Sequence, residues 1–141
     1  MKSHSEAIFD GRDIDLLHKA ERIVEHVPDR NSRDELVRCH EVARIVGKIL
    51  GLPVQDGYYG FVDHSWCWMA PMRPKLSRAR IGVPHILDPY CVGSLPQVRI
   101  VVCDNTALPP AGVAYRADRE RDDIDQEFVR RTILAILRID K

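Results

Sequence analysis

A stripe of apolar residues between positions 36 and 50 constrains the fold more than any other feature of the chain. Ser32 and Glu35 form an S-x-x-E capping box before it, and Gly51 and Pro53 follow it. The sequence therefore predicts a helix that is capped by Ser32 and buries Cys39 against another layer of the protein. The apolar members of the stripe recur every three or four residues and are Leu36, Cys39, Ala43, Val46 and Leu50.

The rest of the chain supplies a further helix on each side and several strands between them. Apolar spacing predicts a first helix between Ile14 and Val27 and a closing helix between Ile124 and Ile139. The order helix, helix, strands, helix is typical of an α+β domain, in which an antiparallel sheet packs against helices. With 141 residues the chain has the size of one domain, which we expect to span residues 1–141. Strands are predicted over residues 54–62, 64–69, 84–87 and 98–102, which are rich in β-forming side chains.

Residues 64–69 alternate in a way that assigns side chains to the two faces of a strand. His64, Trp66 and Trp68 share one face, and the residues between them share the other. We expect the face with the histidine and the tryptophans to pack against the helix that carries Cys39. The two tryptophans suit either the wall of a groove or the core, and aromatic residues on an inward face favour the core.

Composition excludes several classes of function. Lys and Arg together number 21, as do Asp and Glu, so the formal net charge is zero and we expect no nucleic-acid partner. The glycines fit neither dinucleotide nor P-loop spacing, so no nucleotide cofactor is expected. No segment reaches the roughly 20 apolar residues that cross a bilayer, and no signal-like run is present, so we expect a cytoplasmic protein without a membrane partner. In that compartment Cys39, Cys67, Cys91 and Cys103 are interpreted as free thiols.

Three residues on three separate elements have the chemistry of a catalytic triad. Cys39 lies on the predicted helix, His64 on a strand and Asp88 close to the next strand. A thiol becomes a strong nucleophile as its thiolate, which a neighbouring imidazolium stabilises, and a carboxylate fixes the orientation of that imidazole. The opposing interpretation is that Cys39 only packs, since free cysteine is among the most frequently buried residue types.

The motifs around these three residues resemble those of the transglutaminase-like superfamily, whose members share a papain-like core and a Cys, His, Asp order. The resemblance covers residues 39–90. The matching motifs are Cys39 on its helix, Gly51-Leu52-Pro53 (similar to Gly-Ile-Pro), Gly57-Tyr58 (Gly-Tyr), His64-Ser65-Trp66 (His-Ala-Trp) and Asp88-Pro89-Tyr90 (Asp-Pro-Thr).

The resemblance implies a cysteine-dependent hydrolase or acyltransferase that acts on an amide of a peptide or protein through a thioester. It implies Cys39 as the nucleophile, His64 as the general base and Asp88 as the partner of that base, with no metal or organic cofactor. Reactions of the superfamily include peptide hydrolysis, glutamine deamidation, cross-linking and removal of glycans from asparagine. Members of the superfamily usually place the cysteine at the very start of its helix. A helix capped by Ser32 would instead place Cys39 about two turns inside.

Two alternatives remain open from the sequence. A non-catalytic binding module of the same fold would keep Cys39 as a core residue, and the expected helix start at Ser32 favours it. A metal-binding regulator would use His40 and Glu41 together with His64 and Cys67, but no C-x-x-C or H-x-x-x-H spacing supports a zinc site.

Overall fold

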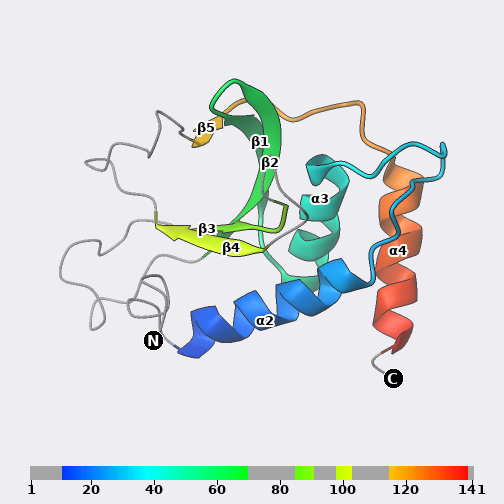
Figure 1. Ribbon diagram of the computed structural model, residues 1–141, viewed down its shortest axis with the longest axis horizontal. Coiled ribbons are helices and arrows are strands. Elements are labelled where there is room, and N and C mark those ends of the chain that lie inside the picture. Colours follow the sequence, from blue (N-terminus) through cyan, green and yellow to red (C-terminus); the bar gives the residue numbers. More distant parts are fainter. Residues whose placement is uncertain (1–10, 70–84, 91–97, 103–114, 140–141) are drawn as a thin grey trace.

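The described part of the chain forms three helices and one five-stranded antiparallel sheet, which confirms the α+β class (Figure 1). The computed structural model describes residues 11–69, 85–90, 98–102 and 115–139. The strand order in the sheet is β4-β3-β2-β1-β5. The elements are α2 (Gly11–Glu25), α3 (Cys39–Leu50), β1 (Val54–Tyr59), β2 (Val62–Met69), β3 (His85–Asp88), β4 (Arg99–Val102), β5 (Tyr115–Ala117) and α4 (Gln126–Ile139).

Strands β1 and β2 form a hairpin, so the single strand predicted over residues 54–62 is wrong at its end. The chain turns at Gly60, whose φ of 65° lies in the left-handed region that glycine tolerates. Gly57 permits a close approach of strand β5, because a Cβ atom there would lie 2.0 Å from the carbonyl oxygen of Arg116. The register pairs Val54 with Cys67 and Tyr59 with Val62.

Helix α3 lies at the centre of the molecule, packed against β2 on one side and against α2 and α4 on others. Figure 1 shows α3 between the sheet and α4. Its residues Ile45 and Val46 are fully buried, and each contributes about 1.5–3 kcal/mol of hydrophobic stabilisation. The core around α3 includes Ala20 and Ile23 of α2, Val42, Ala43 and Val46 of α3, Cys67, Met69 and Leu87 of the sheet, and Phe128 and Ile136 of α4.

The face of β2 that packs against α3 is the opposite of the expected one. Cys67 and Met69 join the core around α3, and the Cys67 thiol donates to the carbonyl of Ala43. Trp66 lies on the other face and packs edge-on against the ring of Tyr115, with 5.2 Å between the ring centroids. The predicted alternation is confirmed, but the assignment of the helix to the tryptophan face is wrong.

The sheet curls so that its two outer strands meet on the tryptophan face. Arg99 of β4 donates to the hydroxyl oxygen of Tyr115 of β5 at 2.9 Å, although three strands separate β4 from β5 in the sheet. Tyr59 of β1 stacks edge-on against Tyr115, at 4.9 Å between centroids. The curled face therefore encloses a layer of aromatic and charged side chains instead of facing solvent.

Helix α3 begins at Cys39, and the predicted start at Ser32 is wrong. The backbone N–H and hydroxyl of Ser32 donate to the carboxylate of Asp125, just before α4, so Ser32 does not cap α3. Leu36, the first member of the predicted stripe, is 66% exposed. The acid that supports the true helix start is Glu41, whose carboxylate accepts the backbone N–H of Arg38 at 3.3 Å.

Candidate active site

Cys39 occupies the first position of helix α3, where backbone N–H groups point out of the helix. The side chain is 8% exposed, and Arg38 before it has the extended backbone of an N-cap residue. The N–H groups of the first helical residues, Cys39 and His40, have no acceptor within the helix. This position combines free hydrogen-bond donors with the positive end of the helix dipole, which together favour a negative charge on or near the sulfur.

His64 and Asp88 form a buried pair on neighbouring strands. The His64 Nε2 atom lies 2.8 Å from Asp88 Oδ2, and neither side chain is exposed. The Tyr115 hydroxyl donates to the same Asp88 oxygen at 2.6 Å, and the backbone N–H of Tyr90 donates to Oδ1 at 3.1 Å. Strands β2, β3 and β5 thus fix the orientation of the carboxylate, which in turn fixes the imidazole of His64.

The second ring nitrogen of His64, Nδ1, is not bound to Asp88 and is available to the Cys39 thiol. His64 Nδ1 is buried and has no well-aligned hydrogen bond within the described part of the chain. Burial by itself lowers the pKa of His64, but hydrogen bonding and charge interaction with Asp88 and then with Cys39 outweigh it and raise the pKa to about 9. The structure therefore brings Cys39, His64 and Asp88 together, and it favours an imidazolium beside the sulfur at neutral pH.

A second histidine, His40, also lies beside the sulfur. Its Nδ1 atom is 3.7 Å from Cys39 Sγ and 2.7 Å from the hydroxyl oxygen of Ser65. Ser65 donates to Asp56 Oδ1 at 2.5 Å, and Arg44 holds the same carboxylate with two hydrogen bonds of 3.0 and 2.6 Å. A chain of four polar side chains therefore runs from α3 through β2 and β1 and back to α3.

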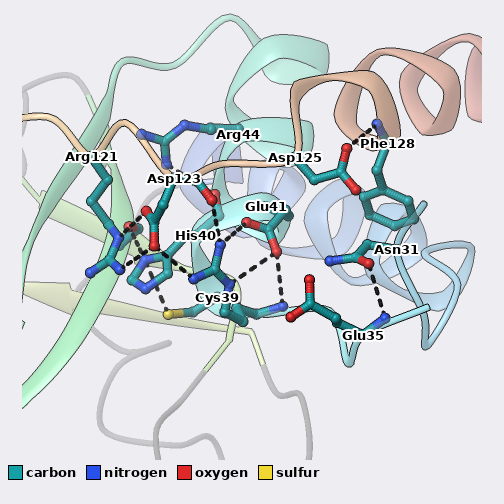
Figure 2. A network of polar contacts seen from close by, with 12 residues as sticks. Asn31, Glu35, Cys39, His40, Glu41, Arg44, Arg121, Asp123, Asp125 and Phe128 are labelled. Atoms are coloured by element: carbon teal, nitrogen blue, oxygen red, sulfur yellow. Dashed lines mark hydrogen bonds and ion pairs between the residues drawn. The ribbon is translucent and has the colours of Figure 1, made fainter. Parts of the chain in front are cut away.

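His40 differs from His64 in its electrical surroundings. Burial, followed by the positive charges of Arg121 and Arg38, lowers the pKa of His40 to about 4. Both guanidinium groups are held in place by Asp123, at 2.8 Å from Arg121 and 3.1 Å from Arg38. Figure 2 shows His40 and Cys39 next to this ion-paired cluster. His40 is therefore neutral at neutral pH, whereas His64 favours its charged form.

The remaining cysteines and tryptophans of the hypothesis do not add a second reactive site among the described residues. Cys67 is buried in the core, and burial raises the pKa of its thiol to about 12, so it stays protonated. Trp66 is fully buried and belongs to the interior layer, not to a groove wall. Cys91 and Cys103 lie outside the described residues.

Neither a metal site nor a membrane segment is found within the described ranges. No group of three or more His, Cys, Asp or Glu side chains there is arranged to hold a metal ion. Glu41, one of the metal candidates, instead binds the Arg38 guanidinium at 3.0 Å. No helix among the described residues is both long and apolar enough to span a bilayer.

Sequence reasoning missed the groups that orient the site. Tyr115 carries no local signal for its role, because its contact with Asp88 depends on the pairing of β5 with β1. Ser65 and Asp56 face each other in the hairpin register, which a correct prediction of the turn at Gly60 would have indicated. His40 entered the sequence interpretation only as a metal ligand.

The site as a whole contains a thiol at a helix start, an imidazole oriented by a carboxylate, and backbone N–H groups without acceptors in the helix. These are the parts that acyl transfer through a thiol requires. In comparisons with known proteins, no family model, no curated protein and no solved structure matches the chain.

Proposed function

We propose that this protein is a cysteine-dependent hydrolase or acyltransferase that acts on an amide bond of a peptide or protein. The observation that carries the proposal is the position of Cys39 at the first residue of α3, where it interacts with His64 of the buried His64–Asp88 pair. A helix start in the middle of a packed domain supplies free N–H groups, which a cysteine inside a helix would lack.

In the proposed reaction, the proton of the Cys39 thiol already resides on His64 Nδ1, and the Cys39 thiolate attacks the carbonyl carbon of the amide. The negative charge that develops on the carbonyl oxygen is bound by the N–H groups of Cys39 and His40. His64 then gives its proton to the departing amine, the C–N bond breaks and a thioester remains on Cys39. Water or a second amine then attacks the thioester and transfers a proton to His64, the C–S bond breaks, and Cys39 leaves as the thiolate beside the protonated His64.

We also propose that the finer fold is a papain-like core of the transglutaminase-like type. The support is the ordered set of motifs from Cys39 to Asp88, together with a helix start at Cys39, which removes the main departure from the pattern of that superfamily. The peptide or protein substrate follows from the same resemblance.

Alkylation of Cys39 by iodoacetamide between pH 5 and pH 9 tests the proposal. The rate at each cysteine is followed by peptide mass spectrometry, with the buried Cys67 as the internal comparison. We expect Cys39 to react with a midpoint well below the value of about 8.5 that is typical of free cysteine. We expect the midpoint to rise in His64→Ala, whereas His18→Ala, which changes an exposed histidine of α2, serves as the matched control.

Two results would argue against an enzyme. If Cys39 is unreactive across the range in the folded protein, the chain is better described as a non-catalytic binding module with Cys39 as a packing residue. If Cys39 reacts with an ordinary midpoint that His64→Ala leaves in place, the imidazole does not activate the sulfur and the proposed mechanism is wrong.

A further inference from the structure

The imidazole of His40, the second histidine beside Cys39, has no task in the proposed reaction, although it is buried and hydrogen-bonded like that of His64. His40 is 4% exposed, and Ser65 and Asp56, to which it is connected, are equally enclosed in the interior. An imidazole next to a nucleophilic sulfur can act as a base, as an acid or as a fixed donor, and its proton position decides which role it takes.

The direction of the hydrogen bonds places a proton on His40 Nδ1. Burial alone would raise the pKa of Asp56, but hydrogen bonds from Arg44, Ser65 and the backbone of Arg121 outweigh it and lower the pKa, so Asp56 is an acceptor only. The single hydroxyl proton of Ser65 therefore points to Asp56. The Ser65 oxygen can then only accept from His40, whose Nδ1 must carry the hydrogen.

The same N–H group faces two acceptors. The Ser65 oxygen is the nearer, at 2.7 Å, and the Cys39 sulfur lies within 3.7 Å of the same nitrogen. A thiolate is a better acceptor than a thiol, because a hydrogen bond to a charged group is the stronger kind. The contact therefore gains strength when the sulfur loses its proton.

We propose that His40 is a positioning residue whose Nδ1–H, locked by Ser65, Asp56 and Arg44, donates to the thiolate of Cys39. This inference rests on the proposed function of Cys39 as a nucleophile. It gives the two histidines separate tasks: His64 moves the proton, and His40 holds the sulfur without competing as a base. The lock passes through α3, β1 and β2, so it places the sulfur relative to the sheet that carries His64.

The charged groups around the sulfur come from several elements, and a variant that tests His40 must not change any of them. His64 and Asp88 approach from the sheet, and Arg38 lies directly before α3. Arg121 and Asp123 approach from the segment before α4. Variants of His40 that carry no charge leave all of these groups in place.

The test compares His40→Asn, His40→Leu and Ser65→Ala by the pH midpoint of Cys39 alkylation. The amide nitrogen of Asn occupies nearly the position of Nδ1, so His40→Asn retains the donor and should keep a midpoint close to that of the unmodified protein. His40→Leu removes the donor, and we expect its midpoint to rise by about one pH unit, which is tenfold less thiolate below the midpoint. Ser65→Ala should also raise the midpoint, because the hydrogen bond that orients the His40 imidazole is lost.

Nitrogen-15 NMR of the His40 ring in the unmodified protein supplies a readout that does not depend on any variant folding. A protonated Nδ1 and an unprotonated Nε2 are expected at pH 7. The opposite tautomer would overturn the inference, as would equal midpoints in His40→Asn and His40→Leu. If the alkylation midpoint of Cys39 in the unmodified protein equals the value of about 8.5 for free cysteine, the proposed function is wrong and His40 has no thiolate to bind. If that midpoint is low but His40→Leu does not raise it, only the role of His40 is wrong.

Discussion

Acidification from pH 7 to pH 5 is expected to destabilise the folded protein through His40. The neutral form of this buried side chain is favoured in the folded state, where its pKa is about 4, whereas an unfolded histidine has a pKa of about 6.5. Below pH 6.5 the unfolded chain therefore binds a proton that the folded chain does not bind. The stabilisation from neutral His40 is complete above about pH 6.5 and is lost as the pH falls toward 4.

The magnitude follows from the gap between the two pKa values. One pKa unit is worth about 1.4 kcal/mol. Acidification is therefore expected to lower the free energy of unfolding by about 2 kcal/mol by pH 5 and by about 3 kcal/mol by pH 4. The side chain is 4% exposed, so solvent screens this term little. His64 has the opposite sign, because its raised pKa stabilises the folded state below about pH 6.5 and the effect is lost as the pH rises through about 9.

Urea denaturation at pH 5, 6, 7 and 8 measures the effect when Cys39→Ala is compared with Cys39→Ala/His40→Asn. The alanine removes the titration of the thiol from both chains. We expect the chain that retains His40 to lose about 2 kcal/mol more between pH 7 and pH 5 than the chain in which asparagine replaces this histidine. Replacement of the exposed His18 by asparagine serves as the control for a histidine on the surface. If the chain that retains His40 loses no more free energy of unfolding between pH 7 and pH 5 than the asparagine chain loses, the reasoning is refuted.

Three further substitutions are expected to lower the free energy of unfolding, measured by urea denaturation at pH 7. Gly57→Ala drives a methyl group into a backbone carbonyl of β5, with an expected loss of about 2 kcal/mol. Arg44→Met leaves the buried Asp56 without its guanidinium, with an expected loss of about 3 kcal/mol. Tyr115→Phe removes a hydrogen bond to Asp88, with an expected loss of about 1.5 kcal/mol.

Each of these substitutions has a control that makes the same or a closely similar chemical change at a position without the contact in question. Gly11→Ala adds a methyl group at the start of α2, where nothing lies within 4 Å. Lys48→Met removes an exposed charge from α3, and Tyr58→Phe changes a half-buried tyrosine of β1. The controls should change the free energy of unfolding by about 0.5 kcal/mol or less. If a substitution changes stability no more than its control, the contact assigned to it does not contribute.

The start of helix α3 shows why local patterns were insufficient at the site. Ser32 has a better capping side chain than Arg38, so sequence rules prefer the wrong start. In the fold, Asp125 accepts the hydrogen bonds of Ser32, and Asp123 holds Arg38 beside the true start. Both acids lie more than 80 residues away along the chain, which is beyond the reach of any capping rule.

Local patterns predicted the three described helices and, in order, the strands from β1 to β4, because helical spacing and strand alternation are properties of neighbouring residues. They gave no indication of β5. The sequence by itself also indicated Cys39, His64 and Asp88 as candidates through their chemistry and order. Which face of β2 meets α3, where α3 begins and which side chains orient Asp88 became clear from the packed fold alone. Those outcomes depend on contacts between distant segments, and such contacts form only when the sheet curls and the helices pack.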